Sequence, residues 1–171
     1  MKIIFLDIDG VLNTSQTFID IHKEWKTTGI RRVEIDEFRV KYLADIIKET
    51  NAKIVLSSSW RIFWNDKLVP LNNQSKELER IFNKYNIKIF SKTCYGKFKL
   101  RQEEIDDWLN NHNNIDNFII IDDESFDLNK YVGNKLIKTS IVSEGDIIRN
   151  MDDCIGLSKE HISKAIKLLN N

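Results

Sequence analysis

The sequence predicts an α/β protein built on an open, doubly wound parallel sheet with helices on both faces. Five short apolar runs of strand length recur along the chain, and amphipathic helical patterns lie between them. Runs that are apolar throughout are typical of parallel strands buried on both faces. Alternation of strand and helix is the pattern of a doubly wound, Rossmann-like sheet. The predicted strands are Ile3 to Leu6, Ala52 to Leu56, Ile87 to Phe90, Phe118 to Ile121 and Lys135 to Ile137.

The predicted helices come from apolar residues that repeat at three- and four-residue spacing, and we expect these faces to pack against the sheet. Asp36 and Ser158 are the predicted N-caps of the first and last of them. The apolar faces are Leu43, Ile46 and Ile47; Leu78, Ile81, Phe82 and Tyr85; Ile105, Trp108 and Leu109; and Ile162, Ala165, Ile166 and Leu169.

Composition favours one globular domain over residues 1–171, since 42% of the residues are hydrophobic and 30% are charged. The 26 basic residues balance the 26 acidic ones. This balance counts against a protein that holds nucleic acid mainly through its phosphates, which usually carries a positive excess. A local basic patch remains compatible with it, and its candidate members are Lys88, Lys92, Lys97, Lys99 and Arg101.

Cysteine use and hydropathy predict a cytoplasmic protein. Cys94 and Cys154 are too few for a disulfide framework, so we expect two reduced thiols and no disulfide partner. No apolar run approaches the length of a membrane span, and the chain begins directly with a strand-like segment instead of a signal peptide.

Polar residues gather where three predicted strands end. Asp7, Asp9 and Gly10 follow the first strand, a triple serine that starts at Ser57 follows the second, and an acidic pair at Asp122 follows the fourth. Carboxylates brought together at one sheet edge repel one another, and a hard cation such as Mg²⁺ relieves that repulsion. Hydroxyl groups and a fixed positive charge suit a phosphate. Taken singly, these acidic residues could instead be turn formers or caps.

In this order the motifs resemble those of haloacid dehalogenase (HAD) phosphohydrolases. Asp7 opens an Asp-x-Asp-Gly-Val-Leu motif, the serine run resembles the second motif, Arg101-Gln-Glu-Glu-Ile the third, and Ile121 to Asp127 the fourth. The run Ser-Ser-Ser-Trp-Arg, the later Arg-Gln-Glu-Glu-Ile-x-x-Trp-Leu, and Gly156-Leu157 before the last helix look most like the small HAD domains of multi-part RNA-repair proteins.

The resemblance implies a Mg²⁺-dependent phosphatase that works through an aspartyl-phosphate. Asp7 would be the nucleophile and Asp9 the general acid and base. The ion would be held by Asp7, the backbone carbonyl of Asp9 and Asp123, with Asp122 as a further or water-mediated partner.

The remaining site residues would bind the phosphoryl group or shape the site. Ser57 or Ser58 would donate a hydrogen bond to it, and Arg101 would balance its charge, with Lys97 and Lys99 as the other candidates. Gly10 would let the loop approach the site closely. The predicted substrate-binding residues are therefore Gly10, Arg61 and Lys99, although a lone arginine such as Arg61 is more often a solvated surface residue. Two further alternatives stay open. Trp60 either packs in the core or lines the cleft. Asp127 is either a catalytic residue or, as we expect, a structural one that caps a helix or forms hydrogen bonds in a loop.

Between Asn13 and Val33 there are about twenty residues, too few for a cap domain of roughly 60 residues. We therefore expect a bare HAD-like core with a short lid or flap around residues 14–34. An open site admits large phosphorylated substrates, which favours a polynucleotide end, a nucleotide or a phosphoprotein over a small sugar phosphate. The alternatives are a small-molecule phosphatase and a non-enzymatic, Mg²⁺-binding phospho-acceptor, and the aspartate at position 9 argues for turnover over storage.

Overall fold

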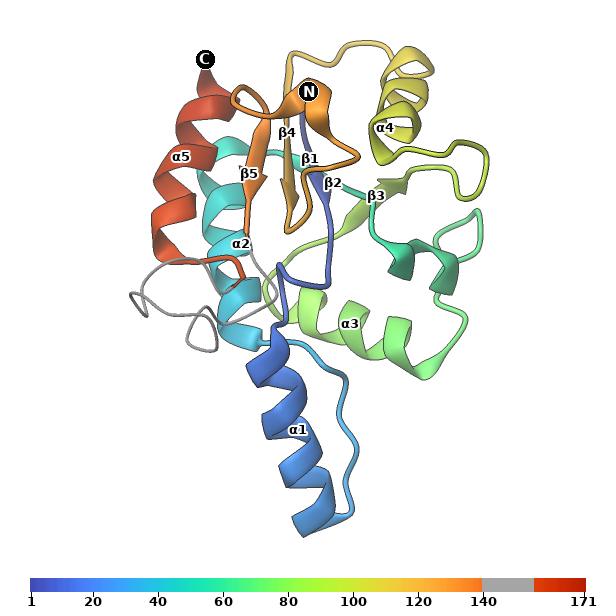
Figure 1. Ribbon diagram of the computed structural model, residues 1–171, viewed down its shortest axis with the longest axis vertical. Coiled ribbons are helices and arrows are strands. Elements are labelled where there is room, and N and C mark those ends of the chain that lie inside the picture. The colour runs from blue at the N-terminus through green and yellow to red at the C-terminus, as the bar shows by residue number, and fades with distance from the viewer. Residues whose placement is uncertain (140–155) are drawn as a thin grey trace.

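The structure, a computed structural model, describes residues 1–139 and 156–171. Within these residues the centre is a five-stranded, all-parallel sheet in the order β3-β2-β1-β4-β5 (Figure 1). The predicted doubly wound α/β fold is confirmed, with β1 in the middle of the sheet. The strands are β1 (Lys2–Leu6), β2 (Lys53–Leu56), β3 (Ile89–Lys92), β4 (Asn117–Asp122) and β5 (Leu136–Lys138).

Helices cover both faces of the sheet, and β1 shows why its sequence is apolar throughout. Ile4 and Leu6 pack into one buried cluster with residues of α2, α3 and α5, whereas Ile3 and Phe5 pack into another with residues of α4 and η2. The helical elements are α1 (Ser15–Thr28), α2 (Glu37–Thr50), α3 (Asn73–Lys84), α4 (Arg101–Asn110), α5 (Lys159–Asn170) and the short 3-10 helices η1 (Ser59–Phe63) and η2 (Asn129–Tyr131).

Two predicted strands are displaced along the sequence. β3 starts at Ile89 and not at Ile87, because Asn86 adopts a left-handed conformation (φ 58°) and the Ile87 N–H bonds to the carbonyl of Phe82. Ile87 is nevertheless buried, so its apolar character reflects the turn after α3 and not the strand. β5 likewise starts one residue later than predicted, at Leu136.

The segment predicted to be a lid begins with α1, which extends away from the body of the molecule beyond the end of β1 (Figure 1). Thr14 caps this helix by accepting a hydrogen bond from the Thr17 N–H. The Thr17 hydroxyl donates to Asp36, the predicted and observed N-cap residue of α2, at 2.7 Å. The base of α1 is therefore tied to the start of α2. The role of residues 14–34 as a flap stays a prediction.

Strand order reverses direction between β1 and β4, because the chain builds β2 and β3 on one side of β1 before it places β4 and β5 on the other. In open α/β sheets, ligands bind at the carboxyl ends of the strands beside such a switch point. Asp7 directly follows β1, and Asp122 is the last residue of β4. The fold therefore brings the two acidic motifs to its expected binding edge.

Candidate active site

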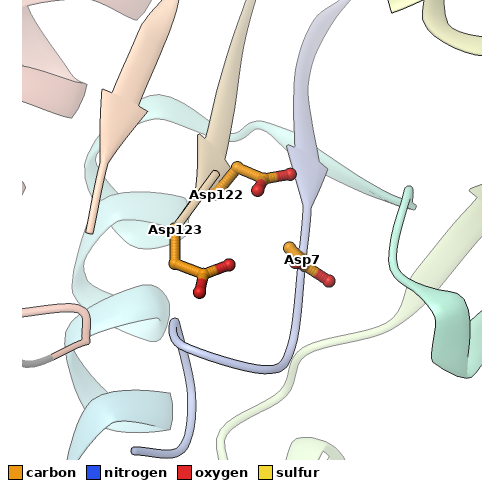
Figure 2. Close-up of side chains that lie close together, drawn as sticks. All are labelled: Asp7, Asp122 and Asp123. Atoms are coloured by element: carbon orange, nitrogen blue, oxygen red, sulfur yellow. The ribbon is translucent and has the colours of Figure 1, made fainter. Parts of the chain in front are cut away.

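Three carboxylates meet at this edge. Leu6 pairs with Ile121 in the sheet, and the Asp7 N–H donates to the Ile121 carbonyl at 3.0 Å, so Asp7 lies beside Asp122 and Asp123. One oxygen from each of these three side chains lies within 4.8 Å of the others. Figure 2 shows the three side chains at the ends of β1 and β4. Asp7 and Asp122 are buried, and Asp123 is partly exposed.

Burial and mutual repulsion make this cluster unfavourable when all three groups are ionised. Desolvation, followed by the charge of Asp7, raises the pKa of Asp122 to about 7 and that of Asp123 to about 6. The oxygen donors of the cluster are the ligand type that Mg²⁺ prefers. A divalent cation therefore fits the residues present, both in donor chemistry and in the charge that it would neutralise.

Arg101, the first residue of α4, is the basic group of the site. Its guanidinium Nη1 donates to Asp7 Oδ2 at 3.0 Å and also contacts Asp122, while its Nε lies 3.9 Å from Asp127 Oδ2. Desolvation opposes its charge, but the carboxylates of Asp7 and Asp122 outweigh that effect and raise the pKa of Arg101. The Asp127 carbonyl also accepts a hydrogen bond from the N–H of Gln102, which ties this loop to the start of α4.

The two lysines weighed beside Arg101 lie elsewhere. The Lys97 ammonium pairs with Asp107 at 2.7 Å on the surface of α4. Lys99 is exposed, and its backbone N–H donates to the Glu103 side chain. Of the three basic candidates, Arg101 alone contacts the acidic cluster among the described residues.

The two serines differ in what their hydroxyl groups do. The Ser57 N–H donates to the Leu6 carbonyl at 3.0 Å, which extends the pairing of β2 with β1. The Ser57 hydroxyl is buried and has no hydrogen-bond partner in the described part of the chain. Ser58, by contrast, uses its hydroxyl to accept from the Trp60 N–H and so caps η1. Of the two serines, Ser57 is therefore the one whose hydroxyl forms no hydrogen bond with another described residue.

Gly10 is required by a close approach. Its φ is +69°, and a Cβ at this position would lie 2.3 Å from the Asp123 carboxyl carbon. Thr139 fixes the same loop, because its hydroxyl donates to the Gly10 carbonyl at 2.7 Å. Any residue with a side chain at position 10 would push Asp123 out of the cluster.

Asp9 projects into a different environment from Asp7. Its Oδ1 accepts from Asn13 Nδ2 at 2.8 Å, and its Oδ2 accepts from the indole N–H of Trp60 at 3.0 Å. Trp60 is buried and packs edge-on against Phe63, so it is a core residue that also faces the site. Sequence reasoning did not single out Asn13, although it stands only four residues after Asp9.

Arg61 is buried, so the solvated alternative for this residue is wrong. Its Nη1 donates to the carbonyls of Ser57 and Ser58, each at 2.7 Å, and its Nη2 pairs with Glu104 Oε2 at 2.6 Å. The guanidinium thus fixes the serine loop through its backbone carbonyls. Glu104 was also missed from the sequence, although its place on the α4 face that buries Ile105 and Trp108 was a usable signal.

Of the two cysteines, Cys94 is a free thiol and Cys154 lies outside the described residues. Burial, followed by the charges of Glu104 and Asp107, raises the pKa of the Cys94 thiol. None of the described helices is long and apolar enough to cross a membrane.

A sequence-family model described as the HAD domain in Swiss Army Knife RNA repair proteins matches residues 3–144. The chain belongs to this HAD family. The match contains all four motifs, from the aspartates after β1 to the acidic pair that ends β4. Neither the curated proteins nor the solved structures contain a significant match to this HAD domain.

Proposed function

We propose that this HAD domain is a Mg²⁺-dependent phosphomonoester hydrolase that works through an aspartyl-phosphate on Asp7. One observation carries the proposal: Asp7 lies within a cluster of three carboxylates that the Arg101 guanidinium contacts, at the carboxyl edge of the sheet. A nucleophilic carboxylate, an oxygen-rich cation site and a fixed positive charge are the parts that phosphoryl transfer requires.

The metal site would consist of Asp7, Asp122 and Asp123, together with the backbone carbonyl of Asp9. When bound there, Mg²⁺ would neutralise charge on the phosphoryl group and fix its orientation. The close contact between Gly10 and Asp123 supports this assignment. Because Gly10 has no side chain, the Asp123 carboxylate can lie against the loop that contains Asp7 and Asp9.

In the first step, an oxygen of Asp7 attacks phosphorus and the bond to the leaving oxygen breaks. Asp9 gives its proton to that leaving oxygen. In the second step, Asp9 takes a proton from water, the water oxygen attacks phosphorus, and the bond to Asp7 breaks. Inorganic phosphate leaves, and both aspartates return to their starting states.

The other residues bind the phosphoryl group. The unpartnered hydroxyl of Ser57 donates a hydrogen bond to a phosphoryl oxygen, and Arg101 offsets the charge that builds up beside Asp7. Arg61 acts on this subsite through the backbone, because it holds the carbonyls of Ser57 and Ser58.

The proposed substrate is a phosphorylated nucleic-acid end. Two observations support it: the family description names RNA repair, and the 14–34 segment offers a single helix and an irregular return segment, not a cap domain. A site without a cap accommodates a polymer end, because nothing must close around the whole substrate.

The test is phosphate release from a panel of substrates, with and without Mg²⁺, for the wild type and Asp7→Asn. The panel holds an aryl phosphate, nucleotides, sugar phosphates, and oligonucleotides that end in a 3′ or 5′ phosphate. We expect Mg²⁺-dependent release that Asp7→Asn lowers at least about a thousand-fold. Asp45→Asn makes the same change on the exposed surface of α2 and serves as the control.

The outcomes separate the alternatives. Release from sugar phosphates but not from oligonucleotides would overturn the substrate class and leave the chemistry standing. If an aspartyl-phosphate forms on Asp7 but is not hydrolysed, the protein is a phospho-acceptor and not a phosphatase.

A further inference from the structure

Both side-chain oxygens of Asp9 are held by donors that the mechanism above does not use. Asn13 Nδ2 binds Oδ1 at 2.8 Å, and Trp60 Nε1 binds Oδ2 at 3.0 Å. We propose that Asn13 and Trp60 are positioning residues, which fix the Asp9 carboxylate in the orientation in which it passes protons to the leaving oxygen and from water. This inference rests on the proposed function of Asp9.

One donor on each oxygen fixes the carboxylate more completely than two donors on one oxygen would. A carboxylate rotates about two side-chain torsions, and a bond to each oxygen restrains both of them. Each oxygen of an ionised carboxylate has two lone pairs, so a lone pair on each remains free to accept a proton. The arrangement therefore orients the group without blocking its chemistry.

The two donors are themselves fixed, so they can impose a geometry. The Asn13 side chain is fully buried, and its Oδ1 accepts from the Gly10 N–H at 3.0 Å. Because that N–H requires an oxygen opposite it, the amide group must present its nitrogen to Asp9. Asn13 Nδ2 also donates to the Glu34 carbonyl at 3.0 Å, at the end of the predicted flap.

The indole group reaches Asp9 from the second motif. Trp60 is the second residue of η1, two positions after the Ser58 cap, and only 6% of its surface is exposed. Its ring lies edge-on to Phe63 with centroids 5.9 Å apart, which limits how far the indole can tilt. Thus η1, which follows the Ser57–Ser58 pair in the chain, also holds the proton-transferring aspartate through Trp60.

The Asp9 side chain is also kept out of the acidic cluster. The three carboxylates that could hold a cation are Asp7, Asp122 and Asp123, and the Asp9 side chain is not among them. Asn13 and Trp60 hold it toward η1 and the return segment of the flap. This separation leaves the Asp9 carboxylate free for proton transfer, while Asp7, Asp122 and Asp123 would hold the cation.

The test uses Trp60→Phe, which keeps an aromatic ring and removes the N–H. For a series of aryl phosphates, the slope of log(kcat/KM) against leaving-group pKa measures how much the enzyme helps the leaving oxygen. General acid catalysis contributes about 10²- to 10⁴-fold. We therefore expect Trp60→Phe to lose about ten-fold with phenyl phosphate and less than about two-fold with dinitrophenyl phosphate, because a weakly basic leaving group needs little protonation.

Two further variants and one control keep the result interpretable. Asn13→Ala should steepen the same slope by removing the other donor, and Asp9→Asn should set the steepest limit. Trp108→Phe is the matched control. The Trp108 indole N–H donates to the Ser91 hydroxyl at 2.9 Å and not to a residue of the acidic cluster. We expect it to leave the slope unchanged.

An equal loss on every aryl phosphate, with an unchanged slope, in folded Trp60→Phe and Asn13→Ala would overturn the positioning role while leaving the proposed function intact. No phosphate release by the wild type from any aryl phosphate or oligonucleotide would overturn the proposed function, and the positioning role with it.

Discussion

Arg61 and Arg101 are two largely buried arginines beside the same site, yet their surroundings differ. Arg61 meets one carboxylate, Glu104, and otherwise donates to backbone carbonyls. Arg101 meets three carboxylates, those of Asp7, Asp122 and, at 3.9 Å, Asp127, beside a cluster that also contains Asp123. The first group of charges is balanced, whereas the second carries an excess of negative charge.

The difference indicates what each arginine does. A buried, balanced pair costs much when one partner is removed, but it offers nothing to a ligand. An unbalanced cluster is unfavourable by itself and becomes favourable when a cation or a charged substrate completes it. We therefore interpret the Arg61 pair as the support of the serine loop and the Arg101 cluster as the place of reaction.

Among the changes that test this comparison of the two arginines, the largest expected effect comes from removing the positive charge at Arg101. Arg101→Met should lower kcat/KM for phosphate release by about 10²- to 10³-fold, the usual cost of losing one electrostatic stabiliser at a reacting group. Arg101→Lys keeps the charge beside Asp7 and should retain activity within about ten-fold. Equal losses in the two variants would show that the guanidinium acts through its shape and not through its charge.

The balanced pair should show its effect in stability. Glu104→Gln leaves the Arg61 charge buried without a partner, so we expect a loss of about 3 kcal/mol in the free energy of unfolding, measured by denaturant titration. Glu77→Gln breaks a surface ion pair with Arg80 and should cost less than about 1 kcal/mol. Similar losses for the two variants would contradict the supporting role of Glu104.

In the unbalanced cluster, removal of a carboxylate should have the opposite effect on the free energy of unfolding, and the effect should depend on metal. In the absence of divalent ions, Asp123→Asn should raise the free energy of unfolding by up to about 1 kcal/mol, because it removes one repelling charge. Mg²⁺ at ten times its Kd should stabilise the wild type by about 1.4 kcal/mol and the variant by much less. A variant that responds to Mg²⁺ as fully as Asp45→Asn would exclude Asp123 as a ligand.

Sequence patterns were enough to find this unbalanced cluster. Asp7 and Asp122 directly follow apolar runs, and parallel strands that start in register also end at one edge. The order of the acidic, serine and basic motifs then indicated which chemistry the edge could support. These features are local in sequence, so periodicity and spacing reveal them.

The balanced contacts were not accessible in this way. Glu104 pairs with Arg61 across 43 residues, and the pairing depends on how α4 packs beside η1. The same holds for the bond from Trp60 to Asp9, which spans 51 residues. The choice between Ser57 and Ser58 was also left open, because it depends on which hydroxyl caps η1.

The smallest expected effect lies at two lysines outside the acidic cluster, to which the same comparison applies. The Lys97 charge is balanced by Asp107, whereas Lys99 forms no ion pair with any described residue. If Lys99 contacts a phosphorylated oligonucleotide, Lys99→Ala should raise KM about two- to three-fold at low salt with kcat unchanged, since rim charges bind substrate and transition state alike. Lys97→Ala should change KM less, because its charge is already compensated. Equal KM values for the wild type and Lys99→Ala at low salt would assign Lys99 to the solvated surface and confine the positive charge of the site to Arg101.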